Sequence, residues 1–435
     1  MAKGVVAIIG RPNVGKSTVF NRIAGERIAI VYDTPGVTRD RLYAKATWLT
    51  REFNIIDTGG IELEDRPFQE QIRAQAEIAI EEADVIVYIA DGQTGVTDDD
   101  KFIVKLLRKT NKPVLLAVNK IDDTHLISNT YEFYSLGLGD PIPLSGVHGV
   151  GIGDLLDKII ENLPKEDKTE DDDTIRFSMI GRPNVGKSSL VNAILKQERV
   201  IVSNIEGTTR DAIDTPFTRN ERNYIAIDTA GLKKRGKIYE SIDKYAALRA
   251  LSAIDKSDVC LLVIDAETGI QEQDKHVVGY AVDAGKAIVI VVNKWDTVTR
   301  TEKAMQEYEK VVREEFKFLD YAPIVFVSAL KGQRIHTVLD AIDLVYDSYT
   351  KRISTSILNE VLLDAIMVNP PNSFNGGFFK VSYANQVSIK PPLFVMFVNN
   401  PKFLHFTYER FMENKLRQSF GFEGTPIKFK YKIKN

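Results

Sequence analysis

The sequence predicts an α/β fold with two tandem domains, each a mostly parallel sheet with helices on both faces, followed by a small α+β domain. Two observations predict it. The eight-residue stretch GRPNVGKS begins at Gly10 and returns unchanged at Gly181. In each copy, continuous apolar segments rich in β-branched residues alternate with helical patterns, as is typical of strands buried on both faces of a parallel sheet.

The apolar segments give the expected strands of the two copies. They lie at 5–9, 53–56, 85–90 and 114–119 in the first copy, and at 175–180, 224–227, 259–264 and 287–293 in the second. Matching motifs are 171 residues apart at the start of the copies and 183 apart near their ends. A whole domain has therefore been duplicated, rather than a short repeat.

The chain changes character after about residue 351. We expect a helix at 356–368, strands at 378–383 and 394–398, a helix at 406–420 and a half-exposed strand at 427–434. Between the two copies, residues 165–173 carry six acidic residues and two lysines, which is typical of a self-repelling linker. The expected boundaries are 1–163, an acidic linker at 164–174, then 175–351 and 352–435.

Composition bounds the class of protein. The 435 residues carry a formal net charge of −3 and are 44% hydrophobic, as in an ordinary soluble globular protein. One cysteine excludes an internal disulfide, and Cys260 is expected to be a buried strand thiol. The first residues lead directly into a strand, which leaves no room for a signal peptide, and no apolar run is long enough for a membrane helix. We therefore expect a cytoplasmic protein.

The repeated stretch has the form G-x-x-x-x-G-K-S, a phosphate-binding (P-loop) motif. Its glycines let successive backbone N–H groups cradle phosphate oxygens. Lys16 and Lys187 are expected to reach the β- and γ-phosphates, and Ser17 and Ser188 to bind Mg²⁺. A glycine-containing turn is the plain alternative. The expected contacts are Gly10, Asn13, Val14, Gly15, Lys16, Ser17 and Thr18, with Gly181, Asn184, Val185, Gly186, Lys187, Ser188 and Ser189.

Two further elements follow each loop. Asp57-Thr58-Gly59-Gly60 and Asp228-Thr229-Ala230-Gly231 have the form D-x-x-G; the aspartate is expected to help hold Mg²⁺, and the N–H of Gly60 or Gly231 to meet the γ-phosphate. Thr38 and Thr209 precede them. A threonine there can bind Mg²⁺ only while the γ-phosphate holds its segment, which is the behaviour of a switch loop.

Base choice is predicted by an N-K-x-D motif after a strand in both copies. The motif residues are Asn119, Lys120 and Asp122, and Asn293, Lys294 and Asp296. An aspartate accepts the two hydrogens that guanine offers at N1 and its exocyclic amine; adenine offers neither, so GTP is favoured and a tandem ATPase is not. Ser145-Gly146 and Ser328-Ala329 are expected to support the base, although Gly146 departs from the usual Ser-Ala.

No side-chain base for hydrolysis is evident. Many GTPases place a water-orienting glutamine directly after D-x-x-G, but this chain has Ile61 and Leu232 there. Catalysis then depends on Mg²⁺, the loop lysine, backbone amides and a further cation. We expect a slow intrinsic rate.

Together, the two GRPNVGKS loops, the acidic linker and the small C-terminal domain resemble the Der (EngA) family of bacterial GTPases over essentially the whole chain. The resemblance implies two P-loop GTPase domains, a KH-like C-terminal domain and a role in assembly of the large ribosomal subunit. It also implies that K⁺ bound near Asn13 and Asn184 replaces the charge of an arginine finger. Alternatively, these asparagines serve only to accommodate an unusual loop dihedral.

The C-terminal domain is the candidate RNA contact. Residues 352–435 hold eleven Lys or Arg and five acidic residues, which suits contact with ribosomal RNA. No G-x-x-G loop lies between its helices, so we do not expect KH-type clamping of a single strand. Lysines that protect an edge strand are the alternative explanation. We expect a monomeric GTPase switch; the second hypothesis is a GTP-sensing RNA-binding scaffold whose hydrolysis is incidental.

Overall fold

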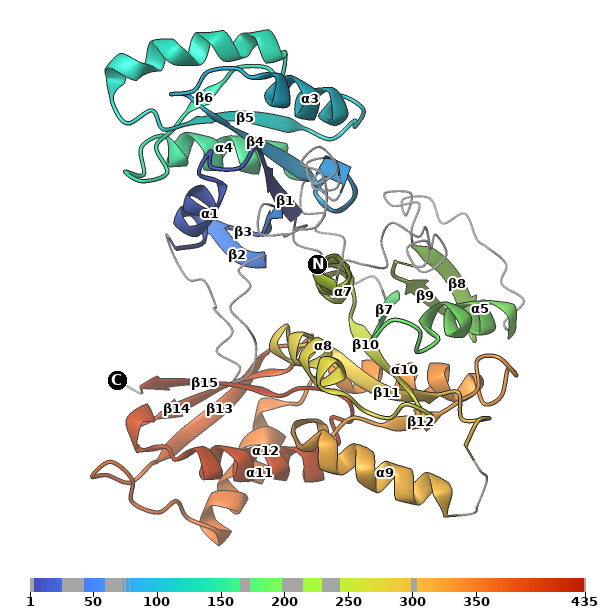
Figure 1. Ribbon diagram of the computed structural model, residues 1–435. Helices are drawn as coiled ribbons and strands as arrows, with labels where there is room; N and C mark the ends of the chain where they lie inside the picture. Colours follow the sequence, from blue (N-terminus) through green and yellow to red (C-terminus); the bar gives the residue numbers. More distant parts are fainter. Residues whose placement is uncertain are drawn as a thin grey trace. The chain divides into compact units, whose positions relative to one another are not determined.

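The computed structural model describes residues 4–25, 43–58, 73, 76–77, 79–164, 173–197, 214–228, 243–298 and 303–433 (Figure 1). Contacts divide them into two compact units, which are described separately. The first holds strands β1 to β6, and the second holds β7 to β15. Among the described helices, none is long and apolar enough to cross a membrane.

The first unit contains a six-stranded sheet in the order β2-β3-β1-β4-β5-β6, and only β2 runs antiparallel to its neighbour. Its strands are β1 Gly4–Ile9, β2 Tyr43–Trp48, β3 Arg51–Asp57, β4 Val85–Asp91, β5 Val114–Asn119 and β6 Ile142–Pro143. Its helices are α1 Lys16–Gly25, α3 Asp98–Leu107 and α4 Ile152–Asn162, with a 3-10 helix, η2, at Thr124–Leu136.

Both faces of this sheet are buried, as the sequence predicts. Val6 and Ile8 of β1 point to a core shared with α1 and α4. Ala7 and Ile9 point to the opposite core, which contains apolar residues of α3. Successive side chains of β1 point to opposite faces of the sheet. Because helices cover both faces, the positions of the strand from Val5 to Ile9 are all buried and apolar.

The second unit repeats this architecture in the order β12-β11-β10-β7-β9-β8, again with one antiparallel edge strand, β8. Its strands are β7 Ile175–Ile180, β8 Thr215–Arg219, β9 Arg222–Ala226, β10 Val259–Asp265, β11 Ala287–Asn293 and β12 Ile324–Phe326. The helices are α5 Lys187–Gln197, α8 Glu272–Asp283, α9 Ala304–Glu315 and α10 His336–Tyr349, with η3 at Lys317–Leu319. Helix α7 Asp243–Lys256 begins in the first unit and ends in the second.

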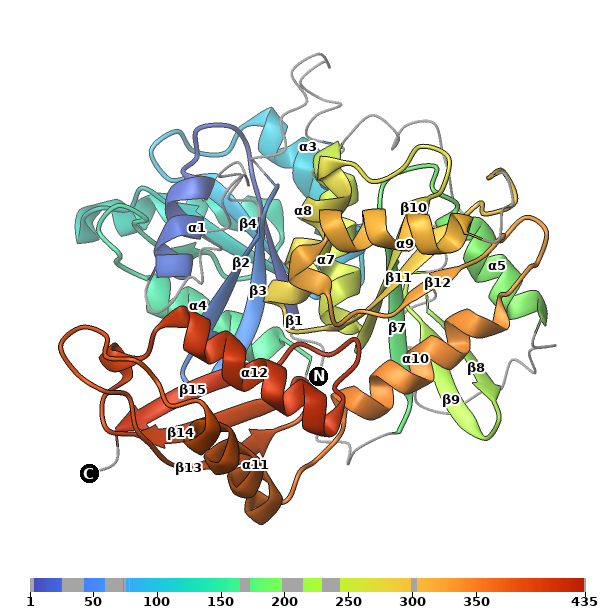
Figure 2. The same ribbon diagram turned by 90° about the horizontal axis from the view of Figure 1, so that it is seen from below.

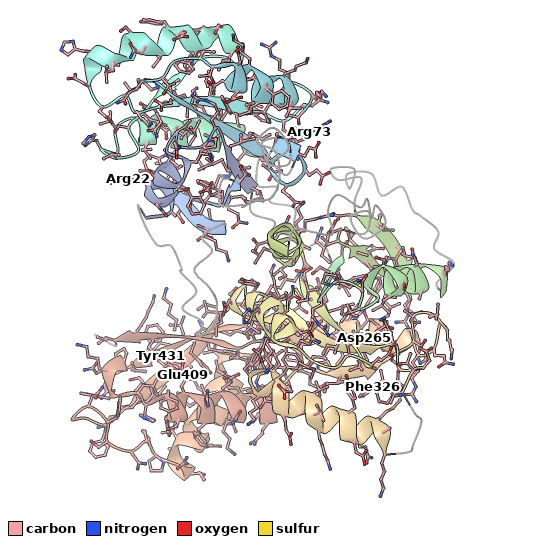
Figure 3. All side chains as sticks on the ribbon, viewed as in Figure 1. Arg22, Arg73, Asp265, Phe326, Glu409 and Tyr431 are labelled. Carbon is pink, nitrogen blue, oxygen red and sulfur yellow. The ribbon has the colours of Figure 1, made fainter. Side chains whose placement is uncertain are left out.

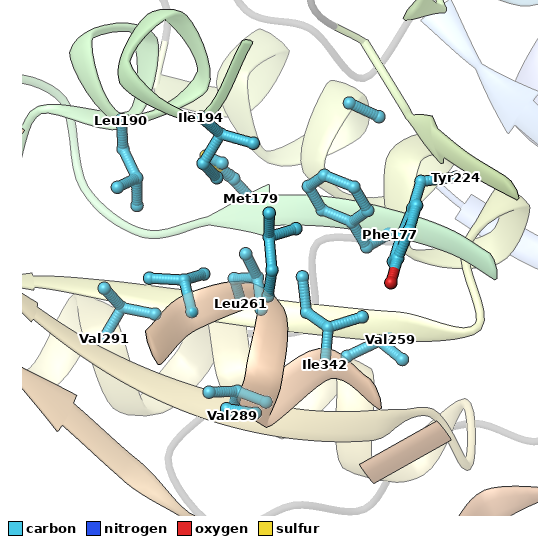
Figure 4. Packing of buried hydrophobic residues seen from close by; sticks show 14 of the residues in the cluster. Phe177, Met179, Leu190, Ile194, Tyr224, Val259, Leu261, Val289, Val291 and Ile342 are labelled. Carbon is cyan, nitrogen blue, oxygen red and sulfur yellow. The ribbon is translucent and has the colours of Figure 1, made fainter. Parts of the chain in front are cut away.

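Apolar side chains of this second sheet interlock with α5 and α10 on one face (Figure 4). Leu261 and Val289 of the central strands lie in the same cluster as Ile342 of α10. Cys260 points to the other core and is fully buried, so it is a strand thiol as expected. Burial raises the pKa of this thiol, which makes it a poor nucleophile.

The C-terminal part has the predicted order helix, two strands, helix, strand. Its elements are α11 Thr355–Val368, β13 Val381–Ser388, β14 Leu393–Val398, η4 Pro401–Phe403, α12 Phe406–Phe420 and β15 Lys428–Ile433. Helices α11 and α12 lie together across one face of the three-stranded sheet (Figure 2). The Tyr431 hydroxyl of β15 donates to Glu409 of α12 at 3.0 Å, which joins the sheet to this helix layer (Figure 3).

The predicted bounds of β13 were wrong. We expected a strand at 378–383, whereas β13 spans Val381–Ser388. Gln386 faces inward in this strand: its Nε2 donates to Lys351 O at 2.9 Å, and its Oε1 accepts from Ile353 N at 2.7 Å. A polar residue at a core position hid the period of two by which a half-buried strand is recognised.

Gly424 joins the C-terminal part to the six-stranded sheet of the second unit. Its N–H donates to Tyr321 O, and its carbonyl accepts from Ile288 N of β11, both at 2.7 Å. The residue has φ 63°, and an added Cβ would lie 2.3 Å from Val345 Cγ2 of α10. Only glycine fits here without displacement.

We expect Gly424→Ala to destabilise the second unit by about 2–4 kcal/mol, because a left-handed alanine and an overpacked contact both add cost. Gly279→Ala is the matched control: this glycine lies inside α8 with nothing within 4 Å of an added Cβ. It should stabilise by about 0.5–1 kcal/mol. Scanning calorimetry measures both variants; an unchanged transition for Gly424→Ala would contradict the close fit.

Candidate functional site

The two GRPNVGKS loops take the same backbone path. They connect β1 to α1 and β7 to α5. Asn13 and Asn184 have φ values of 64° and 65°, and Gly15 and Gly186 follow at 90° and 96°. Left-handed residues in such a loop turn successive N–H groups toward one concavity, which suits an anion.

Close packing explains why glycines occupy two positions of each loop. A Cβ on Gly15 or Gly186 would lie 2.3 Å from the side-chain amide of Asn119 or Asn293. The first glycine is restricted by the neighbouring strand: a Cβ on Gly10 would lie 2.3 Å from Ile89 O, and at Gly181 it would lie 2.5 Å from Val263 O. Each loop is therefore pressed against both the sheet and the base motif.

The loop lysines bend back over their own loops. Lys16 Nζ donates to Arg11 O at 2.7 Å. Lys187 Nζ donates to Gly181 O and Arg182 O, both at 2.7 Å. Burial lowers the pKa of Lys16, and the nearby Asp57 carboxylate acts in the opposite direction. A phosphate anion would offer Lys16 a full charge in place of a carbonyl dipole.

The first copy brings its two described magnesium candidates together. Ser17 Oγ donates to Asp57 Oδ2 at 2.8 Å, and hydroxyl and carboxylate oxygens are the donors that Mg²⁺ prefers. In the second copy, Asp228 lies two residues beyond β9 at φ 59°, and its N–H donates to Asp214 Oδ1 at 3.0 Å. Asp57, by contrast, ends β3.

Four expected site residues lie outside the described part of the chain: Thr38, Gly60, Thr209 and Gly231.

The N-K-x-D asparagine holds each site together. Asn119 Nδ2 donates to Val14 O of the phosphate loop at 2.8 Å, and its Oδ1 accepts from Gly146 N at 2.9 Å. Asn293 makes the same bonds to Val185 O at 2.9 Å and from Ala329 N at 3.0 Å. Since a backbone N–H makes the contact, Gly146 serves as well as the usual alanine.

The aspartates of the motif meet the serines predicted to support the base. Ser145 Oγ donates to Asp122 Oδ1 at 2.5 Å. In the second copy, the hydrogen bond from Ser328 and the Lys331 ammonium 3.4 Å away lower the pKa of Asp296. Asp296 therefore stays charged near neutral pH, as pairing with guanine N1–H requires.

Thr18 and Ser189 are exposed at the start of α1 and α5. Thr18 lies close to the base-supporting loop, since its Cγ2 would be 3.4 Å from a Cβ at Gly146.

A family model described as "50S ribosome-binding GTPase" matches residues 5–120 and 176–294. Another, the "KH-domain-like of EngA bacterial GTPase enzymes, C-terminal", matches residues 352–432. GTPase Der of Oceanobacillus iheyensis is 62% identical over 429 residues, and that of Bacillus cereus is 59% identical over 428; each match covers 98% of both chains.

The chain belongs to the GTPase Der family. It is a GTP-binding switch protein that hydrolyses GTP to GDP and phosphate. The expected fold class is confirmed as two P-loop GTPase folds followed by a KH-like domain.

Sequence reasoning missed three residues that support each site of this Der-family chain. Asp91 accepts from Lys120 Nζ at 2.6 Å, and Asp265 accepts from Lys294 Nζ at the same distance. Figure 3 labels Asp265 at the end of β10. Asp100 and Asp274 bind the loop arginines, Arg11 and Arg182. The sequence does contain a signal for them. A Thr-Gly pair with an aspartate on either side occurs in both copies, and the two occurrences are 174 residues apart, as are the two N-K-x-D motifs.

Proposed function

We propose that both copies bind GTP with Mg²⁺, and that hydrolysis controls a step in assembly of the large ribosomal subunit. The matching bonds made by Asn119 and Asn293 support two guanine sites of one design. The ribosomal role rests on the family model, whose description names 50S ribosome binding.

The basic strand β15 supports contact with ribosomal RNA. Lys430 and Lys432 are exposed on the face of the sheet opposite α11 and α12. Across the strands, Lys432 pairs in register with Phe397, whose ring stacks on Tyr383 with a centroid distance of 4.3 Å. Cations beside an accessible aromatic pair suit a phosphate backbone and unpaired bases.

The test compares single-turnover GTP hydrolysis with and without purified large subunits. We expect the subunits to accelerate hydrolysis, and Lys430→Glu with Lys432→Glu to abolish both acceleration and co-sedimentation. Lys415→Glu, a charge reversal at a partly exposed residue of α12, is the control. GTP-dependent binding with no change in hydrolysis would favour the alternative, an RNA-binding scaffold whose hydrolysis is incidental. No binding in either nucleotide state would reject the ribosomal role.

A potassium requirement is the second part of the proposal. The family resemblance implies K⁺ near Asn13 and Asn184, but their positive φ values also give a purely conformational reason for asparagine. We expect GTP turnover to be faster in KCl than in NaCl at equal ionic strength, because K⁺ would stabilise charge that develops between the phosphates.

Glycine substitution separates the two explanations. Asn13→Gly with Asn184→Gly keeps the left-handed backbone without strain and removes both amide oxygens. If these oxygens bind K⁺, the variant loses the difference between the two salts. Equal wild-type rates in KCl and NaCl would eliminate the potassium requirement.

A further inference from the structure

A ten-residue segment links the central strand to the next helix in each copy. We call residues 91–100 the first brace and residues 265–274 the second brace. Each begins and ends with aspartate and has Thr-Gly at its fourth and fifth positions. The turns agree closely: Gly95 has φ 77° and its N–H donates to Asp91 O at 3.1 Å, while Gly269 has φ 67° and donates to Asp265 O at 3.0 Å.

The first aspartate of each brace holds the base motif. Asp91 Oδ2 accepts from Lys120 Nζ at 2.6 Å, and its Oδ1 accepts from Gln93 N at 2.9 Å. Asp265 receives the same two kinds of bond, from Lys294 Nζ at 2.6 Å and from Glu267 N at 2.9 Å. Burial acts to raise the pKa of both carboxyls, but these donors outweigh it and lower the pKa.

The last aspartate of each brace holds the phosphate loop. Arg11 Nε donates to Asp100 at 2.9 Å, and Arg182 Nε donates to Asp274 at 2.8 Å. Both carboxylates have no exposed surface, and the arginines are 14% and 12% exposed. The carbonyl oxygen of the same arginine accepts from the loop lysine, at 2.7 Å in each copy.

Each copy reinforces a different end of this ion pair. In the first, Tyr88 OH adds a bond to Asp100 at 2.5 Å. Leu262 occupies the matching position in β10 and offers no such donor. In the second, Arg182 Nη2 gains bonds to Gly269 O at 2.8 Å and Thr268 Oγ1 at 3.2 Å.

We propose that the two braces fix the spacing between the guanine-reading loop and the phosphate loop, and that Asp100 and Asp274 are positioning residues for Lys16 and Lys187. Through the arginine side chain, each carboxylate sets the position of the carbonyl against which the lysine rests. The brace thus connects the two ends of one nucleotide site through its own backbone and the hydrogen bonds at its two ends. This inference rests on GTP binding and is independent of the ribosomal role.

The proposal predicts that the two ends of the brace affect different parts of the nucleotide. Arg11→Gln with Arg182→Gln releases the phosphate loop but leaves the base motif anchored. In catalysis, a misplacement near 1 Å lowers the rate about a hundredfold. For a misplaced lysine in a binding site, we expect the dissociation constants for GDP and GTP to rise by about 10–100-fold. That for GMP, which lacks the phosphates the lysine reaches, should change less than about twofold.

Asp91→Asn with Asp265→Asn provides the opposite change. It weakens the hydrogen bonds that position Lys120 and Lys294. The dissociation constants for GMP, GDP and GTP should therefore rise by the same factor. The full-length protein is used throughout, with competition against a fluorescent guanine nucleotide. Lys101→Gln with Lys275→Gln, whose ion pairs to Asp98 and Glu272 lie on the same two helices, should leave all three constants unchanged.

Arg11→Lys with Arg182→Lys guards against a folding defect, because lysine keeps a positive charge beside the buried carboxylate but cannot reproduce the guanidinium geometry. Its loss of GDP and GTP affinity should be intermediate. If the arginine variants raise the dissociation constants for GMP, GDP and GTP equally, the arginine–aspartate ion pairs have only a structural role. If all three dissociation constants are unchanged, the proposal that the braces position the loop lysines is wrong.

Discussion

Asp122→Asn and Asp296→Asn should each exchange guanine for xanthine at one site. A carboxylate accepts two hydrogens from guanine, whereas an amide accepts one and donates the other, which matches xanthine with its carbonyl at C2. Since the altered site leaves polar groups unpaired against guanine, we expect GTP affinity there to fall by about a thousandfold or more. Xanthosine triphosphate should gain affinity correspondingly.

Titration calorimetry can count the sites in this experiment. Each single variant should bind one GTP and one xanthosine triphosphate, and the double variant two of the latter. Asp123→Asn, which alters an exposed neighbour of Asp122, is the control and should keep two GTP sites. A single variant that still binds two GTP molecules would show that this aspartate does not read the base.

The second large effect is expected at the loop lysines. Lys16→Met or Lys187→Met removes the cation that would face the transferred phosphate, while its aliphatic stem is preserved. Losing one such electrostatic contact costs about 10²–10³-fold in rate, so single-turnover hydrolysis at that site should almost stop. Lys196→Met, an exposed change on the last turn of α5, should have no effect. Retained hydrolysis at both sites would contradict the assignment.

Lys16 should also make nucleotide affinity depend on pH. Its pKa is lowered by burial in the free site, and a bound phosphate would raise it again. Binding therefore favours the protonated lysine, so affinity at the first site is full below the free-state pKa and falls as the pH rises through it. Lys16→Met should remove this dependence. A wild-type affinity that is flat on the alkaline side would contradict it.

The sequence predicted the central strands of both GTPase sheets but not their edges. Strands β2 and β8 were missed because polar residues interrupt them, as is common in an antiparallel edge strand, unlike the continuous apolar runs of β4 and β10. Strand β6 has two residues and β12 has three, too few for any period to appear. Gln386 concealed the extent of β13 in another way, since the backbone groups that it bonds at Lys351 and Ile353 are distant in sequence.

The nucleotide motifs were predictable because their residues are fixed by the chemistry of a phosphate and a purine. Asn119 and Asn293 were singled out for the base, but their second role, bridging the phosphate loop to residues 146 and 329, needs three separate loops to meet. Asp100 could be found only by comparing the two copies. In the run from Asp98 to Asp100, the third aspartate alone has an aspartate, Asp274, at the matching position of the second copy, and it alone is fully buried.

The contacts of Gly424 show that the C-terminal domain defined by sequence similarity is not a separate structural unit in this chain. The family model for the last domain begins at residue 352, but Lys351 Nζ bonds Phe420 O and Lys390 N bonds Tyr349 O across that boundary. A truncated piece starting at 352 would lose those bonds as well as the bond from Ile288. Residues 173–435 would keep them, and they form the more natural module for expression and dissection.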